Sequence, residues 1–346
     1  MAYVKLADIA AATGISISGV SKALADSPEI SAQTRLRVQQ TAAAMGYHSN
    51  TFARSLRLGS SKLIGVIIPR NDNPFYSGIL QGISETLTAQ GYTMIVTTSG
   101  DTMQGESAAL ASLLSIPTCG ILAVPFALEN YRHVTQPLVF MSRYPYRDCP
   151  EAACFPAQPE HDSYVVNDDF EGQRLAVQYL LSQGYEKIYL MLDAVNPQSL
   201  GTYKALMRLS GYRAACEAAG LPYDSGRVFM HIDTPAICYS TAKMLCTENP
   251  AGGFAVCTTN DYISMAALSA VRESGLCVPE QVAVVGYDGI EWGAYYTPQL
   301  TTVQLANKEI GIHAAQYLHL RLCGQMQPQQ KLATALNPCL LKRQTA

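Results

Sequence analysis

Long apolar runs are missing from this chain of 346 residues. The two longest, around 63–68 and 120–128, are far shorter than the ~20 residues that a helix needs to cross a bilayer. An apolar secretion signal is missing as well, because residues 1–5 lead directly into a polar helical pattern. The first absence excludes a membrane-spanning class, and the second leads us to expect a cytoplasmic protein.

Paired cysteines and common catalytic motifs are also missing. The ten cysteines are scattered without a C-x-x-C pair, which favours reduced thiols in a large core over a disulfide framework. The sequence has no G-x-S-x-G turn, no histidine pair at metal-ligand spacing and no phosphate-binding glycine loop. His161 beside Asp162 is more simply a loop pair. We therefore expect no enzyme, no metal and no cofactor.

Charge is sparse and unevenly divided along the chain. Charged residues make up 15% of the sequence and hydrophobic residues 48%, as in a globular protein rather than a disordered one. Residues 1–60 hold six Lys or Arg against three acids, a net charge of +3, so the remaining residues carry −6. A cationic amino-terminal segment on an anionic body suits a protein whose first segment meets phosphates.

The amino-terminal segment does contain a pattern of three short helices. The first has apolar residues at helical spacing and ends at Gly14, and the second begins at Ser16, a favoured N-cap residue. The third begins at Ser31 and ends at Gly46. Two short helices joined by a tight turn with glycine form a helix-turn-helix, whose second helix enters the major groove of DNA.

Beyond residue 58, strand and helix patterns alternate up to about residue 325. Residues 63–68 form a buried strand pattern, and Asn73–Pro74 begins a helix that continues to Gly91, with Asn as N-cap and Pro at the first position. Further strands are predicted at 93–99, 120–125, 138–141, 188–192, 255–257 and 282–286, and further helices at 106–115 and from about Asp169, Lys204, Tyr239, Ile263 and Lys308. This alternation predicts parallel sheets covered by helices. A body of roughly 280 residues exceeds one core, so we expect two lobes with a ligand cleft at the strand ends.

Short motifs in a fixed order connect both parts of the chain to one family. The head carries L-x-D-I-A, G-I-S-x-x-x-V-S-K and S-x-x-T-R-x-R-V, and then G-Y-x-x-N-x-x-A-R-S-L. The body carries I-G-V-I-I-P with N-P-F, R-L-S-G-Y-R-A-A, T-N-D, V-V-G-Y-D and T-P-Q-L-T-T-V. Over nearly its whole length the chain resembles the lactose-repressor/galactose-repressor (LacI/GalR) family of bacterial transcription regulators. The resemblance implies a homodimer with two heads on a pseudo-palindromic operator and a periplasmic-binding-protein-like body that binds an effector.

The resemblance also implies domain boundaries. It places the helix-turn-helix domain at 1–47, a hinge helix and linker at 48–60, and a body of two doubly wound parallel-sheet lobes at 61–340. The chain should cross between the lobes near Asp162, Glu291 and Cys323. The amino lobe then holds 61–162 and 291–322, and the carboxyl lobe holds 163–290 and 323–340. No sustained apolar heptad follows Leu332, so we expect a dimer rather than a tetramer.

The outward face of the second helix is predicted to read DNA. In relatives the positions of Ile17, Ser18 and Lys22 contact bases, and Lys22 can donate to guanine O6 and N7. Ile17 lies opposite the inward-facing residues, which favours a base contact, with packing in the small head core as the alternative. Hydroxyl side chains suit phosphate contacts, and those expected here are Ser16, Ser21, Ser31 and Thr34, of which Ser16 and Ser31 also cap helices.

Residues 50–58 resemble the hinge helix of the family, which orders only on operator. Asn50 and Ala53 are expected to contact DNA there. Leu56 matches the leucine that enters the minor groove at a central step and kinks the duplex. A leucine on a lone, short, polar helix has no obvious core of its own to enter, which independently favours this wedge.

The cleft is expected to hold the effector. By resemblance, Phe75 and Tyr76 follow the first strand–helix turn, and Arg208 stands where the family has a ligand-anchoring arginine. The full set of expected effector-binding residues is Phe75, Tyr76, Arg208, Asp233, Asn260, Asp261, Asp288 and Trp292. Acids and an arginine suit the hydroxyl groups of a sugar, and aromatic rings suit its C–H face.

Structural alternatives apply to several of these residues. Trp292 either stacks on a sugar ring or packs at a lobe crossing, and Asp288 either binds ligand or caps the next turn. Asp168 and Glu171 have D-x-x-E capping spacing, so we assign Asp168 a structural role. The purine-binding branch of the family has Arg and aromatic residues where this chain has Thr202 and Asp233, which favours a sugar or sugar derivative over a nucleobase.

Two other classes of protein share parts of this pattern. A solute receptor with the same body and no DNA role is disfavoured by the helix-turn-helix head and the missing secretion signal. An enzyme is disfavoured by the missing catalytic motifs. The sequence thus predicts a DNA-binding repressor of a carbohydrate-utilisation operon, controlled by a small sugar-like effector.

Overall fold

The computed structural model describes residues 4–47, 61–148, 155, 163–193, 195–327 and 330–346. The chain forms two compact units, Met1–Ser61 and Lys62–Ala346, which we call the head and the body. The predicted hinge, with Asn50, Ala53 and Leu56, lies outside the described residues. Within the described part, none of the helices has the length and apolar character needed to span a membrane.

The head is the predicted helix-turn-helix. It consists of α1 (Leu6–Thr13), α2 (Ile17–Leu24) and α3 (Ala32–Ala44), around a core that includes Ile9, Val20 and Val38. Gly14 ends α1 in the left-handed conformation, with φ 68°, which glycine adopts without strain. Ser16 begins α2 by accepting a hydrogen bond from Gly19 N at 3.1 Å.

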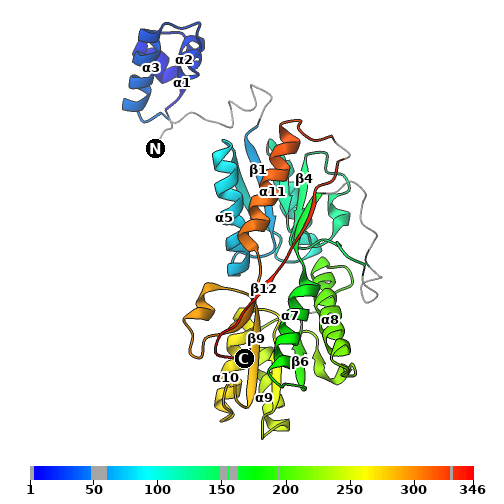
Figure 1. Ribbon diagram of the computed structural model, residues 1–346. Helices are drawn as coiled ribbons and strands as arrows, with labels where there is room; N and C mark the ends of the chain where they lie inside the picture. Colours follow the sequence, from blue (N-terminus) through cyan, green and yellow to red (C-terminus); the bar gives the residue numbers. More distant parts are fainter. Residues whose placement is uncertain (1–3, 48–60, 149–154, 156–162, 194, 328–329) are drawn as a thin grey trace. The chain divides into compact units, whose positions relative to one another are not determined.

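The body contains two six-stranded sheets, one in each lobe (Figure 1). The amino-lobe sheet has the strand order β11-β5-β4-β3-β1-β2, and the carboxyl-lobe sheet has the order β12-β10-β9-β8-β6-β7. The amino-lobe strands are β1 (Leu63–Ile68), β2 (Thr93–Thr98), β3 (Thr118–Ala123), β4 (Leu138–Met141), β5 (Ser163–Asn167) and β11 (Ala333–Leu336). The carboxyl-lobe strands are β6 (Ile188–Met191), β7 (Val228–Phe229), β8 (Phe254–Cys257), β9 (Val282–Asp288), β10 (Thr301–Gln304) and β12 (Cys339–Leu341). All neighbouring pairs in the described sheets are parallel except β10 and β12, which confirms the predicted fold class.

Helices cover the sheets of both lobes. The amino lobe has α5 (Pro74–Ala89), α6 (Met103–Leu114) and α11 (Asn307–Leu322), and the carboxyl lobe has α7 (Asp169–Ser182), α8 (Leu200–Ala218), α9 (Pro235–Glu248) and α10 (Asp261–Glu273). Short 3-10 turns are η1 (Leu128–Tyr131), η3 (Ser225–Arg227) and η4 (Glu291–Ala294). Helices α5 and α11 pack backbone against backbone, since a Cβ at Gly82 would lie 2.1 Å from Lys308 O and one at Gly311 would lie 2.1 Å from Ile79 O.

Several helices begin earlier than the sequence pattern predicts. Helix α6 begins at Met103 after Thr102, and α8 begins at Leu200 after Ser199; each hydroxyl accepts a hydrogen bond from a backbone N–H of the first turn. The predicted starts at 106 and 204 missed these caps. Asp168 caps α7 by accepting from Glu171 N at 3.0 Å, which confirms its structural assignment.

The three lobe crossings lie later in the chain than predicted. The first follows β5, at Asn167 rather than near Asp162, and the second follows β10, at Gln304 rather than near Glu291. The third lies between β11 and β12, at 337–338 rather than near Cys323. In each case the chain adds one more short strand to the sheet of one lobe before it crosses to the other lobe. The sequence pattern did not predict β5, β10, β11 and β12 as separate strands, so the crossings were placed too early.

The body also continues past the predicted end at 340. Thr345 is fully buried, and its hydroxyl donates to Val284 O at 2.6 Å. The carbonyl oxygen of Ala346 accepts from the Tyr179 hydroxyl at 2.8 Å. The last residues therefore belong to the carboxyl lobe.

Candidate DNA interface and ligand cavity

The surface of α2 carries the residues that sequence analysis assigns to DNA. Ile17 is 53% exposed, so it is outside the head core, and Ser18 is exposed beside it. Lys22 is also exposed and forms an ion pair with Glu29 in the loop after α2. The head therefore presents an apolar side chain and a cation on one helix, and the cation must leave Glu29 to reach a base or a phosphate.

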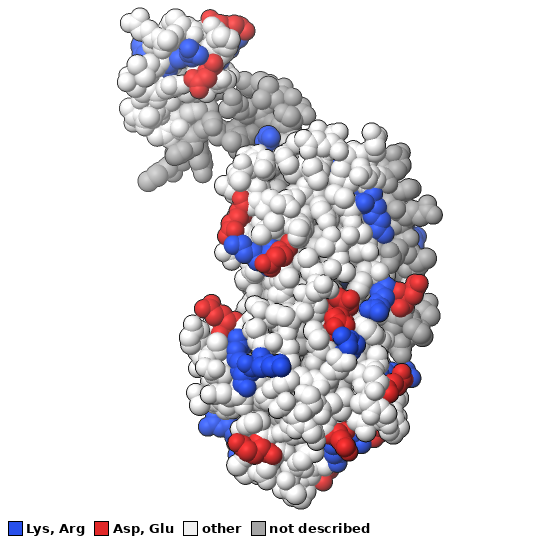
Figure 2. Space-filling model, viewed as in Figure 1, with Lys and Arg blue, Asp and Glu red and all other residues white. Residues whose placement is uncertain are grey.

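The hydroxyl residues of the head have mainly local partners. Ser16 caps α2, and Ser31 caps α3 by accepting from Thr34 N at 3.3 Å. The Ser31 hydroxyl also donates to Thr34 Oγ1 at 2.9 Å. Phosphate contact by Ser31 or Thr34 therefore competes with this pair. Ser21 is half-exposed on α2. On the face seen in Figure 2, charged side chains on both units are sparse, and acidic and basic atoms lie close together.

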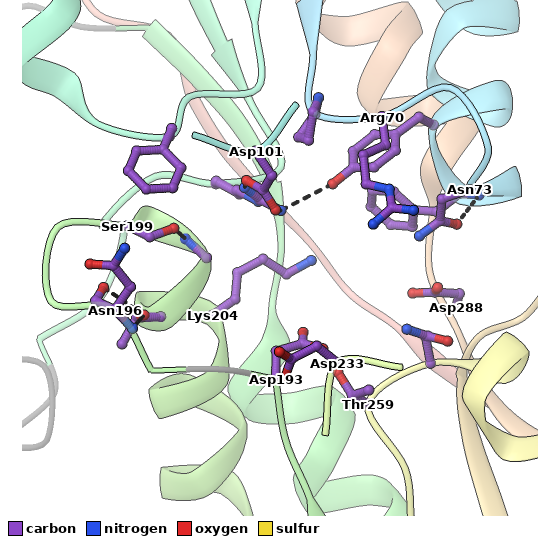
Figure 3. Close-up of a pocket in the computed structure, with 18 of the residues that line it drawn as sticks. Arg70, Asn73, Asp101, Asp193, Asn196, Ser199, Lys204, Asp233, Thr259 and Asp288 are labelled. Atoms are coloured by element: carbon purple, nitrogen blue, oxygen red, sulfur yellow. Dashed lines mark hydrogen bonds and ion pairs between the residues drawn. The ribbon is translucent and has the colours of Figure 1, made fainter. Parts of the chain in front are cut away.

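The body contains a cavity of about 350 Å³ that is lined from both lobes (Figure 3). Six of the eight predicted effector residues line it, namely Phe75, Tyr76, Arg208, Asp233, Asn260 and Asp288. They come from the start of α5, the middle of α8, the segment after β7, and the ends of β8 and β9. The ends of parallel strands thus meet at this cavity, as expected for sheets of this kind.

Arg208 is held rigidly in the cavity wall. Its Nε donates to Asp169 Oδ1 at 2.8 Å, its Nη1 donates to Thr259 O at 2.6 Å, and its guanidinium lies 3.6 Å from the ring centroid of Tyr287. Burial is the largest single influence and acts to lower the pKa of Arg208, but Asp169 together with Tyr287, Asp288 and Asp193 outweighs it, and the pKa is raised. Arg208 is therefore a fixed cation that presents an oriented fork of donors to the cavity.

Asp288 is the buried acid of the cavity floor. It ends β9 with φ 110°, a strained conformation for a residue other than glycine. Burial raises its pKa to about 8, and the nearby Asp261 adds to this, while Arg208 and Lys204 partly offset it. Near neutral pH the carboxyl group can thus both donate and accept hydrogen bonds, which suits a hydroxyl ligand.

Two predicted effector residues are not in the cavity wall. Asp261 is fully buried at the start of α10, where it accepts from Ile290 N at 2.7 Å and from the Thr302 hydroxyl at 2.5 Å. It therefore ties α10 to the loop after β9, and burial raises its pKa to about 7. Trp292 is 73% exposed on η4. Neither residue lines this cavity, and their role toward an effector stays a prediction. For Asp261, strand-end position alone does not say to which side the side chain turns.

The cavity also contains charged residues that sequence analysis missed. Arg143 forms an ion pair with Asp101, in which Nη2 donates to Oδ2 at 3.0 Å, and it donates to the Tyr76 hydroxyl at 3.3 Å. Lys204 extends into the middle of the cavity in Figure 3, with Nζ 4.0 Å from Asp169 and 5.0 Å from the ring centroid of Phe75. Burial lowers the pKa of Lys204. Lys204 lies one helical turn before Arg208, so i, i+4 spacing was a signal that pointed to it.

Known protein families match both the head and the body of this chain. Residues 5–50 match the family described as bacterial regulatory proteins, lacI family, and residues 177–346 match the periplasmic binding protein-like domain. The chain belongs to the lacI family of bacterial regulatory proteins. This lacI-family protein is therefore a DNA-binding transcriptional regulator and not an enzyme.

Similar proteins cover the whole chain. The ribose operon repressor of Escherichia coli (strain K12) is 28% identical over 347 residues, which cover 98% of each sequence. The complex of the transcriptional regulator CelR with cellobiose is 26% identical, with a TM-score of 0.70, and the match covers 99% of this chain and 100% of that one. The Lac repressor dimer bound to operator and the anti-inducer ONPF has the same fold, with a TM-score of 0.82 at 23% identity over 99% of both chains.

Proposed function

We propose that this lacI-family repressor acts in the cytoplasm as a homodimer whose two heads bind a pseudo-palindromic operator. A sugar or a sugar derivative in the cavity of the body controls operator affinity, and its binding loosens DNA. The observation that carries the proposal is that a fixed Arg208 and a protonatable Asp288 lie in the same cavity, which is lined from both lobes. The regulated genes would then serve carbohydrate utilisation.

The chemistry of the cavity supports a polyhydroxylated ligand. Its wall is dominated by charged, amide and hydroxyl side chains, with Phe75, Tyr76 and Phe126 as its aromatic members. Alternating donors and acceptors match the hydroxyl groups of a sugar, and a volume of about 350 Å³ suits a small one. Thr202 and Asp233 both line the cavity and offer no flat surface for a nucleobase.

The printed names of relatives support the same class of ligand. One relative is a ribose operon repressor, and CelR is described in complex with cellobiose. A nucleobase is the second candidate, since purine repressors are also among the relatives, at about 25% identity. The missing arginine and aromatic residue at positions 202 and 233 favour the sugar.

Exposed aromatic residues of the carboxyl lobe support the homodimer. Tyr262 is 65% exposed, Trp292 is 73% exposed and Tyr295 is 79% exposed. The Asp261–Ile290 hydrogen bond joins the start of α10 to the segment before η4, so Tyr262 and Trp292 belong to the same region of the surface. Clusters of large exposed aromatic side chains are typical of protein–protein interfaces. We propose that this aromatic surface of the carboxyl lobe binds a second copy of the chain. Sedimentation at micromolar concentration should give two chain masses, and four would contradict it.

A ligand screen tests the effector. Thermal shift of the full chain against neutral sugars, sugar acids, sugar phosphates and nucleobases should find a sugar or sugar derivative that stabilises the body. At a hundred times its dissociation constant, a ligand adds ~2.7 kcal/mol to the free energy of unfolding. Stabilisation by a nucleobase, with none by any sugar, would contradict the proposal. Operator, selected from random duplexes by the full chain, should then be released by the same sugar.

A further inference from the structure

The first turn of α8 forms hydrogen bonds with two loops of the opposite lobe. Helix α8 belongs to the carboxyl lobe, whereas Phe126 follows β3, and Tyr146 and Arg147 follow β4, in the amino lobe. Leu200 N donates to Phe126 O at 2.8 Å. The Tyr203 hydroxyl accepts from Tyr146 N at 3.1 Å and from Arg147 N at 2.9 Å, and it donates to Arg147 O at 2.7 Å. Four hydrogen bonds therefore cross between the lobes beside the cavity.

The Tyr203 hydroxyl is fully used by these contacts. A phenol has one donor and two acceptor positions, and all three are occupied. Tyr203 is only 2% exposed, and its ring meets the ring of Tyr146 edge to face, with centroids 6.0 Å apart. Removal of the oxygen would leave two partly buried backbone N–H groups without their acceptor, which favours separation of the two surfaces.

The loop that holds Leu200 is itself fixed. Glu106 is fully buried in the amino lobe, and its carboxylate accepts from Phe126 N at 2.5 Å, from Ala127 N at 3.1 Å and from the Tyr131 hydroxyl at 2.9 Å. The Phe126 carbonyl is therefore presented by a rigid loop. On the other side of the contact, α8 is a regular helix of 19 residues that also carries Lys204 and Arg208 of the cavity wall.

We propose that the first turn of α8 is a clasp that holds the two lobes closed without ligand, and that Tyr203 is a positioning residue that sets how often the cavity opens. The four hydrogen bonds break together, because a rigid helix cannot leave one loop and stay on the other. Ligand entry and release then require this opening. The inference rests on the proposed function only in taking the cavity as the effector site.

Hydrogen–deuterium exchange of the ligand-free full chain tests the clasp. In Tyr203→Phe, amides of peptides that cover 143–148 should exchange about tenfold faster, because Tyr146 N and Arg147 N lose their acceptor. The decisive peptide covers 199–201, since Leu200 N is bonded to Phe126 and not to Tyr203. A concerted clasp accelerates its exchange by a similar factor. Exchange of Leu200 at the wild-type rate, with faster exchange only at 143–148, would overturn the clasp.

Matched variants separate the clasp from a general loss of stability. Tyr239→Phe removes a hydroxyl that bonds to Glu273 on the surface, and it should leave both peptides at wild-type rates. Peptides of the buried strand β9 should be unchanged in all proteins. Leu200→Pro tests the hydrogen bond between Leu200 and Phe126. Proline is tolerated at the first position of a helix, and it removes the N–H that donates to Phe126 O. It should accelerate exchange at 143–148, and an unchanged rate there would contradict the clasp.

The wild-type chain gives a result even if a variant does not fold. Exchange at 143–148 and at 199–201 should respond equally to low urea, as for two segments exposed by one opening. Unequal responses would overturn the proposal. The measurement uses neither sugar nor DNA, so a failed clasp leaves the sugar proposal standing, and a ligand screen without a binding sugar leaves the clasp standing.

Discussion

The residues of the head that are predicted to contact bases are exposed, whereas the main ionisable residues of the cavity in the body are buried. In the head, a small core that includes Ile9, Val20 and Val38 is fully buried, while Ile17 and Lys22 point outward from α2. In the body, the ionisable cavity residues Arg208 and Asp288 are buried, and Arg208 depends on Asp169 and Thr259, which are far from it in the sequence. A surface that reads DNA can therefore change residue by residue, whereas the cavity changes only with its supporting contacts. The two sites should accordingly respond differently to substitution.

The largest expected effect is that of Arg208→Ala. The change leaves the Asp169 carboxylate buried without its main cation, which costs ~3–5 kcal/mol of stability for a buried pair broken on one side. It should also abolish the response to the sugar. Urea unfolding of the body measures the first effect and thermal shift with the sugar the second. Arg272→Ala, at an exposed position near the end of α10, is the control and should change neither. Full stability with full sugar response in Arg208→Ala would show that the cavity does not depend on this pair.

The next effect is expected at Leu56. If Leu56 enters the minor groove, Leu56→Ala should weaken operator binding by up to ~1.5–3 kcal/mol, the range for burial of a leucine side chain. Stability of the body and affinity for the sugar should stay at wild-type values. Fluorescence anisotropy with labelled operator measures the loss. Unchanged operator affinity would refute the wedge.

Replacement of Lys22 should weaken DNA binding by an amount that depends on the DNA sequence. Lys22→Ala is expected to cost ~1–3 kcal/mol on operator and to relax preference at one base pair of each half-site. Glu29→Gln is the matched variant, because it removes the acid that holds Lys22 in the free head, and it should not weaken binding. Equal losses on operator and on random DNA would show that Lys22 contacts only phosphate.

A pH dependence of body stability due to Asp288 is also expected. Its pKa is about 8 in the folded protein, far above the ~4 of an unfolded aspartate. Between these values the folded state keeps a proton that the unfolded state has lost, so this contribution to stability falls as pH rises from about 4 to about 8. Asp288→Asn remains neutral, and its unfolding free energy should fall less over this window than that of wild type. Parallel curves for the two proteins would show that Asp288 titrates normally.

The sequence predicted more of the head than of the cavity. Local signals set the helices of the head, because Gly14 and the caps at Ser16 and Ser31 act within one turn. Outward placement of Ile17 also followed from helical spacing alone. The cavity needed long-range information, since Arg143 meets Asp101 from another strand end and no local pattern links them.

The neighbouring acids Asp261 and Asp288 show which part of the cavity the sequence could not predict. Asp261 and Asp288 both stand at the ends of neighbouring strands, yet Asp261 turns to Thr302 and Ile290 while Asp288 turns to the cavity. Side-chain direction at a strand end depends on the following loop, here through a backbone conformation of φ 110° at Asp288 that sequence does not reveal. The lobe crossings were misplaced because β5, β10, β11 and β12 are only three to five residues long, too short to show a clear period in the sequence.

We propose that the DNA-reading surface of the head and the ligand cavity of the body are separate sites joined by one equilibrium. The most direct test titrates operator with and without the sugar found by the ligand screen, in wild type, Lys22→Ala and Asp288→Asn. Coupling of 1–3 kcal/mol predicts that the sugar weakens wild-type operator binding roughly 5–150-fold. The Asp288→Asn protein should bind operator with wild-type affinity, and the sugar should not change that affinity. The Lys22→Ala protein should bind the sugar with wild-type affinity and bind operator more weakly than wild type does. Equal damage to both affinities by both substitutions, in proteins that remain folded, would contradict the account.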